Sequence, residues 1–119
     1  MELSDKIQIC KVVARAVLAD AMLTDTEIAF LNRLMDKYEL DGEQRKDVMA
    51  RNIDDDVSEM AEQITEFESK NELLAELAQA VAVDGEISTS EKQLLTDVAA
   101  ALGIDQSELD MLVETALGS

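Results

Sequence analysis

The chain contains an internal duplication with an offset of 64 residues, and this repeat limits the folds that are open to it. Identical residues stand at corresponding positions in the two halves: Ala16 and Ala80, Val17 and Val81, Asp20 and Asp84, Glu27 and Glu91, Leu31 and Leu95, Asp41 and Asp105. A chain of 119 residues has the size of one compact domain. The two copies are therefore expected to share a single core.

In both copies, apolar residues recur every three or four positions, which is the period of an α-helix packed on one side. Proline is absent, and the hydrophobic fraction of 47% includes few aromatic residues, so Leu, Ala, Ile, Val and Met must fill the core between helices. Gly103 follows one of these segments and can end a helix with a positive φ. Residues with capping side chains precede the segments, often with Glu or Gln three positions later, as in a capping box. The expected N-caps are Ser4, Thr24, Asp41, Asp56, Ser69, Ser88 and Asp105.

The pattern predicts an all-α, compact bundle of seven helices with two pseudo-symmetric halves. Repeat A, about residues 4–51, and repeat B, about residues 69–117, each supply three helices, and a connector helix at about residues 57–68 joins them. The first helix of each repeat, about residues 4–19 and 70–83, is apolar around most of its circumference. Such helices are expected at the centre of the bundle. Further residues expected to face the core are Ile28 in the second helix and Met60, Ile64 and Phe67 in the connector.

The formal net charge of −17 and the lack of histidine disfavour several classes of function. Binding to nucleic acid or to an anionic membrane surface depends on Lys and Arg, which are outnumbered here by acids. Without histidine, the Ser-His and Cys-His catalytic arrangements and the usual zinc sites are not available. Cys10 is the only cysteine and lies in an apolar run, so we expect a core residue without a disulfide. The polar N-terminus and the lack of a long apolar run predict a cytoplasmic protein with no membrane insertion.

Each repeat contains an acidic loop between its first two helices, and these loops are the candidate site. The second loop supplies Asp84 and Glu86, and Glu91 follows in the first turn of the next helix. Asp20 and Glu27 are the equivalents of Asp84 and Glu91 in the first repeat. Carboxylates beside the free carbonyl groups of a helix C-terminus suit a hard cation. The loops are therefore candidates for binding Ca²⁺, Mg²⁺ or Mn²⁺.

The two loops differ from each other and from a known calcium motif. An EF-hand is excluded because apolar Ala80 and Ala82 would occupy two ligand positions of its loop. The first loop has Ala21 and Met22 in place of the glycine and the middle glutamate of the second, so the second is expected to be the better cation site. The loops could converge on one site or form two. The alternative explanation is that the acids are only helix caps and loop hydrogen-bond acceptors.

The second loop belongs to a longer motif: Asp-Gly-x-Ile-Ser-x-x-Glu after an Ala/Val-rich helix, then Leu-Leu and a Leu-Gly-Ile-Asp turn. Its residues are Asp84, Gly85, Glu86, Ile87, Ser88, Glu91, Leu94, Leu95, Leu102, Gly103 and Ile104. This motif, within residues 73–113, resembles the TerB-like family, which includes tellurite-resistance proteins and the N-terminal domain of a DnaJ-type co-chaperone. The first half fits more loosely, through Asp20, Leu23, Glu27 and Leu31. The resemblance implies an all-helical, cytoplasmic bacterial protein that is linked to tellurite or other chemical stress. It also implies a binding or scaffolding role, with the loop acids binding a divalent metal.

Three hypotheses of function follow. The leading one is a non-enzymatic stress-response module that holds a divalent cation through the acidic loops and has a protein partner. The alternative is a metal-independent protein-interaction scaffold in which the loop acids act only as helix caps. The third is carboxylate- or metal-assisted hydrolysis, which is disfavoured because a small, filled helical bundle offers little room for a substrate.

Overall fold

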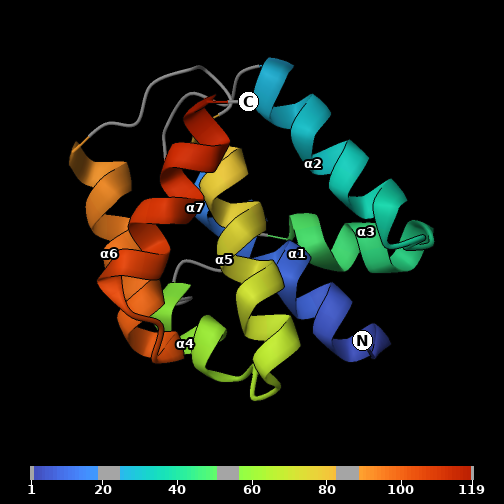
Figure 1. The fold of residues 1–119 in the computed structure, drawn as a ribbon. Coiled ribbons are helices and arrows are strands. Elements are labelled where there is room, and N and C mark those ends of the chain that lie inside the picture. The colour runs from blue at the N-terminus through green and yellow to red at the C-terminus, as the bar shows by residue number, and fades with distance from the viewer. Residues whose placement is uncertain (1, 19–24, 51–56, 83–88, 119) are drawn as a thin grey trace.

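The structure, a computed structural model, describes residues 2–18, 25–50, 57–82 and 89–118, and all regular structure in these ranges is helical (Figure 1). The helices in these ranges are α1 (Leu3–Leu18), α2 (Asp25–Lys37), α3 (Gly42–Met49), α4 (Val57–Glu62), α5 (Phe67–Val81), α6 (Thr89–Leu102) and α7 (Gln106–Gly118). The predicted all-α bundle of seven helices is confirmed. The radius of gyration of the Cα atoms is 13.1 Å, close to the roughly 13.5 Å of one compact domain of this length.

Helices α1 and α5 pack against each other and form the centre of the bundle, as their apolar character predicts (Figure 1). α1 also contacts α2, α3 and α4, and α5 also contacts α6 and α7. Ile9 and Val13 of α1 are fully buried, as are Leu73 and Leu77 of α5. Removing each such side chain from water contributes roughly 1.5–3 kcal/mol. The two first helices of the repeats therefore supply the middle of a shared core.

The starts of corresponding helices follow the same 64-residue offset as the sequence. α1 and α5 begin at residues 3 and 67, α2 and α6 at residues 25 and 89, and α3 and α7 at residues 42 and 106. α4 has no counterpart among the described helices and contacts α1 and α6, which come from different repeats. The pseudo-symmetry of the two halves in space stays a prediction.

Helices α2 and α6 end in the same hydrogen-bonded turn, a Schellman motif. At the end of α6, the N–H of Gly103 and that of the next residue donate to two carbonyl groups of the last turn, at 3.1 and 2.9 Å. At the end of α2, the N–H of Glu39 and that of its successor make the equivalent bonds, at 3.0 and 3.1 Å. The motif needs a positive φ, which is 73° at Gly103 and 57° at Glu39. The prediction for Gly103 is confirmed, whereas Glu39 adopts a left-handed conformation that carries strain for any residue with a Cβ.

The capping box predicted at Asp41 is confirmed, and the N-cap predicted at Ser4 is wrong. At the start of α3, the N–H of Gln44 donates to the Asp41 carboxylate, and the N–H of Asp41 donates to the Gln44 side chain, each at 2.8 Å. Ser4 does not cap α1, because the helix already begins at Leu3 and the carbonyl of Glu2 accepts from the N–H of residue 6 at 3.1 Å. The caps predicted at positions 24, 56 and 88 lie outside the described residues.

Ser69 lies inside the first turn of α5 and not before it, so its predicted N-cap role is also wrong. Its buried hydroxyl donates a hydrogen bond of 2.8 Å to the carboxylate of Asp5, in the first turn of α1. Glu72, the expected partner of Ser69 in a capping box, instead contacts α2. Ser69 thus links the starts of the two central helices.

The connector helix is shorter than predicted. α4 ends at Glu62 and does not continue to residue 68, because α5 has already begun at Phe67. Ile64 is buried and Met60 packs against the core, as predicted. Phe67 is 76% exposed and Ile28 is 37% exposed, so the predicted burial of these two side chains is wrong. None of the helices in the described ranges has the length and apolar character needed to cross a membrane.

Candidate functional site

The structure describes two of the five residues predicted to hold a cation. Asp20, Asp84 and Glu86 lie outside the described residues, so their role stays a prediction. Glu27 and Glu91 occupy the first turns of α2 and α6, and each is half-buried. Carboxylates are stabilised there by the free N–H groups and the positive end of the helix dipole. Both glutamates therefore stand at the start of the helix that follows an acidic loop.

The helix starts that carry Glu27 and Glu91 lie apart from each other. In Figure 1, the N-terminal ends of α2 and α6 lie on opposite sides of α7 and of the C-terminal end of α5. Within the described ranges, no three side chains of His, Cys, Asp or Glu gather closely enough to hold a metal ion. The described residues alone therefore do not assemble the predicted metal site.

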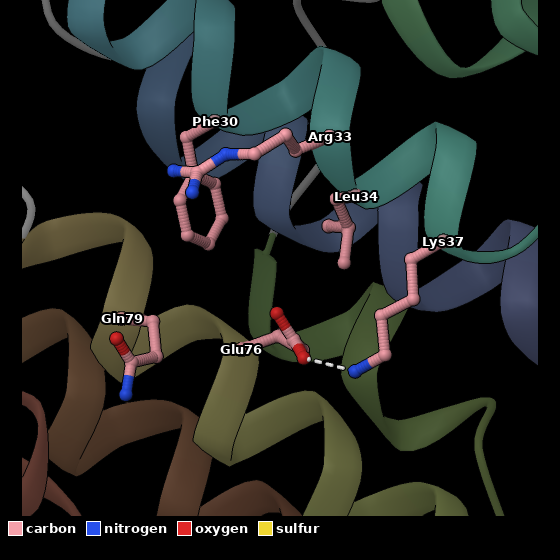
Figure 2. A pocket seen from close by; sticks show the side chains of 6 residues that line it. All are labelled: Phe30, Arg33, Leu34, Lys37, Glu76 and Gln79. Atoms are coloured by element: carbon pink, nitrogen blue, oxygen red, sulfur yellow. Dashed lines mark hydrogen bonds and ion pairs between the residues drawn. The ribbon is translucent and has the colours of Figure 1, made fainter.

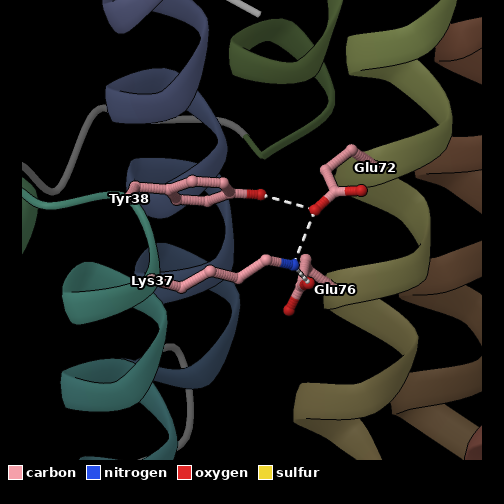
Figure 3. A network of polar contacts seen from close by, with 4 residues as sticks. All are labelled: Lys37, Tyr38, Glu72 and Glu76. Carbon is pink, nitrogen blue, oxygen red and sulfur yellow. Dashed lines mark hydrogen bonds and ion pairs between the residues drawn. The ribbon is translucent and has the colours of Figure 1, made fainter.

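A polar network joins the C-terminal end of α2 to α5, and sequence analysis did not predict it (Figure 3). The Nζ atom of Lys37 lies 2.8 Å from Oε1 of Glu72 and 2.7 Å from Oε1 of Glu76. The hydroxyl of Tyr38 donates to the same Oε1 of Glu72 at 2.9 Å. The two glutamates are one turn apart on α5, so a single lysine can bridge them. The network holds the end of α2 against a central helix.

Hydrogen bonds and burial shift the pKa values of Lys37, Tyr38 and Glu72. The hydrogen bond from Lys37 lowers the pKa of Glu72, and hydrogen bonds to Glu72 and Glu76 raise the pKa of Lys37. Burial, followed by the hydrogen bond to Glu72, raises the pKa of Tyr38. General acid–base catalysis works best with a group whose pKa lies near the working pH. The pKa shifts of Lys37, Tyr38 and Glu72 all lead away from that range, which disfavours acid–base catalysis by these three groups.

A groove of about 500 Å³ lies beside this network, between α2 and α5 (Figure 2). The guanidinium of Arg33 lies 5.9 Å from the centre of the Phe30 ring, within the range of a cation–π contact. The groove combines cationic, anionic and apolar side chains. The residues that line it are Phe30, Arg33, Leu34, Lys37, Glu76 and Gln79.

Cys10, the strongest potential nucleophile of the chain, is fully buried in the core. Burial, and to a lesser extent the charge of nearby Glu76, raises the pKa of its thiol to about 12. The thiolate is the reactive form of cysteine. In the folded protein, Cys10 is therefore a core residue, as its apolar sequence context predicts.

The protein is a small, acidic helical bundle in which the described polar network links neighbouring helices. The model of the family described as Tellurite resistance protein TerB matches residues 6–113. The chain therefore belongs to the TerB family, and the match extends across both repeats. Comparisons with curated proteins and with solved structures gave no significant match.

Proposed function

We propose that this protein is a non-enzymatic binding module of tellurite resistance and stress response. Membership of the TerB family over residues 6–113 is the observation that carries the proposal. Tellurite is an oxyanion, and a chain with a net charge of −17 repels it. Thiol chemistry on the oxyanion would need an accessible thiolate, and Cys10 is buried. The proposed role is therefore to bind a cation and a protein partner and not to transform tellurite.

The proposed cation is a divalent hard ion held by the loop acids of each repeat. Glu91 would act together with Asp84 and Glu86, and Glu27 together with Asp20. Support comes from the matching positions of the two glutamates, which are both half-buried in the first turn of the helix after an acidic loop. Because the starts of α2 and α6 lie apart in Figure 1, we propose two sites and not one. Carboxylate ligands favour Ca²⁺, Mg²⁺ or Mn²⁺ over softer ions.

An amide NMR titration of the whole protein with Ca²⁺, Mg²⁺ and Mn²⁺ tests this proposal. Constant high ionic strength is required, because any added cation screens a chain of this charge. Asp84→Asn and Glu91→Gln each remove one proposed ligand. Glu43→Gln is the matched control, since Glu43 is also an acid in the first turn of a helix, α3.

A specific site gives saturable shifts around Gly85 and Glu91 that both ligand variants abolish and Glu43→Gln preserves. Asp20→Asn and Glu27→Gln are expected to act in the same way on the first repeat, with weaker binding. Shifts that follow ionic strength, or that survive in Glu91→Gln, would refute cation binding and leave the acids as helix caps.

A metal-independent protein-interaction scaffold is the second candidate. The observation that favours it is the presence of large apolar side chains on an acidic surface, among them Phe67 and Met111. In this case the loop variants would leave partner binding unchanged, and substitutions on the apolar surface would abolish it.

A further inference from the structure

Two large apolar side chains are more exposed than any others that the structure describes. Phe67, the first residue of α5, is 76% exposed, and Met111, in the middle of α7, is 68% exposed. Single exposed apolar residues are common on soluble proteins. Several of them in one patch indicate a binding surface.

A groove of about 260 Å³ lies beside Phe67 and reaches α7 at Glu108, whereas Met111 lies outside its lining. It runs between the start of α5 and the turn that joins α6 to α7, and both Phe67 and Glu108 line it. Glu108 and Met111 are three residues apart on α7, so they are neighbours on one face of that helix. We call this area the Phe67–Met111 surface. Its members are Phe67, Lys70, Ile104, Asp105, Glu108 and Met111.

This surface is strongly acidic at its edges. Asp105 and Glu108 line the groove beside Phe67, whereas Asp110 and Glu114 line a separate groove together with Lys92. Glu66 and Glu68 stand on either side of Phe67 in the sequence and are exposed. Lys70 is the one basic residue among the members of the surface. Apolar anchors with carboxylates beside them complement a ligand that is both apolar and basic.

We propose that the Phe67–Met111 surface binds a basic amphipathic helix of a partner protein. A helix presents apolar and cationic residues together at spacings of three and four, which fits two apolar anchors with acids around them. Methionine adapts its shape to different apolar partners, which suits such a surface. A second copy of the chain, an anionic membrane or a nucleic acid would bring like charge to the same acids. The proposal deepens the protein-binding role proposed above and does not depend on the cation.

The test uses a synthetic amphipathic helix of about 18 residues, five turns, made of Leu and Lys, and its counterpart of Leu and Glu. Binding to the whole protein is measured by fluorescence anisotropy, and the contacted residues are located by amide NMR shifts. Phe67→Ser and Met111→Ser remove the two anchors, and their high exposure means that folding is preserved. Ile28→Ser on α2 is the control, since Ile28 is also apolar and partly exposed.

The proposal predicts that the Leu/Lys helix binds and the Leu/Glu helix does not, with shifts confined to the start of α5 and to residues 103–114. Each anchor variant should weaken binding by about tenfold or more, as expected for an interface hot spot, and Ile28→Ser by less than about twofold. Affinity should fall as salt rises from about 0.05 M to about 0.5 M. Equal affinity of the anchor variants and the wild type, or shifts spread over the whole acidic surface, would overturn it. So would a dimer of the free protein that Phe67→Ser dissociates, or binding to anionic vesicles through Phe67.

The amide shifts that report peptide binding and those that report cation binding come from different parts of the molecule. The cation titration reports on the starts of α2 and α6, and the peptide titration on α5 and α7. A protein that fails one test can therefore still pass the other.

Discussion

Replacing Glu39 by glycine should make the protein more stable. Glu39 has a φ of 57° at the end of α2, where the equivalent turn of α6 has Gly103 with a φ of 73°. A residue with a Cβ pays about 1–2 kcal/mol in this left-handed conformation. Glycine removes that strain but makes the unfolded chain more flexible, which costs about 0.4–1 kcal/mol. The net gain in the free energy of unfolding is about 0.5–1 kcal/mol.

The reverse change, Gly103→Glu, should lower the free energy of unfolding by about the same amount. A Cβ at position 103 would meet no atom within 4 Å, so the cost is limited to the backbone. Glu39→Gln separates conformation from charge, because a carboxylate at a helix C-terminus is also mildly unfavourable. The free energy of unfolding of Glu39→Gln should exceed that of the wild type by no more than about 0.3 kcal/mol.

Denaturant unfolding at constant pH and salt measures all three variants, and thermal unfolding provides a second measurement. An unfolding entropy of about 2.1 cal/mol/K per residue makes 1 kcal/mol equal to about 4 °C in a domain of this length. Glu39→Gly should therefore raise Tm by about 2–4 °C. A stability of Glu39→Gly at or below that of the wild type, or an unchanged stability of Gly103→Glu, would refute the strain argument.

Two further predictions concern the core thiol and the polar network. Cys10 should resist alkylation by iodoacetamide in the folded protein at about pH 8 and react at once in denaturant, because burial raises its pKa to about 12; rapid labelling of the native state would contradict its burial. The lowered pKa of Glu72 means that its contribution to stability is complete above its usual pKa of 4.5 and is lost as the pH falls through the lower value of the folded state. Lys37→Met should therefore reduce the loss of unfolding free energy between about pH 6 and about pH 3, and an unchanged acid dependence would show that Lys37 does not set the pKa of Glu72.

Sequence patterns predicted the helices well because apolar residues recur in each segment with a helical period, although the N-caps predicted at Ser4 and Ser69 are wrong. The boundary between α4 and α5 was missed for a local reason. The sequence from Ser69 to Glu72 matches the Ser-x-x-Glu pattern of a capping box, but it lies within the first turn of α5, whereas the capping box described above is formed by Asp41 and Gln44. The Ser69 hydroxyl instead donates a hydrogen bond to Asp5, which is distant in the sequence, so the local pattern could not reveal this contact. The exposure of Phe67 was missed because an apolar residue at a helical period looks like a core residue.

The unusual turn at Glu39 could have been found from the sequence. Position 39 corresponds to Gly103 through the 64-residue offset, so a left-handed residue was to be expected there even without a glycine. The network of Lys37, Glu72 and Glu76 could not have been predicted from the sequence. Lys37 is 35 and 39 residues away from the two glutamates, so their pairing depends on how α2 and α5 are placed in the fold. Of the candidate cation site, Glu27 and Glu91 were correctly placed in first helical turns.

The packing of α1 against α5 has a consequence for how the protein is made. α1 ends at Leu18, but α5 ends at Val81, so the ribosome must add 63 more residues before the whole of α5 exists. At about 5–20 residues per second, this delay is roughly 3–13 s. During that time the apolar surface of α1 that α5 later covers is exposed to the cell, and chaperones can bind it. α1 is thus synthesised well before α5 and completes its contacts only after α5 has been made.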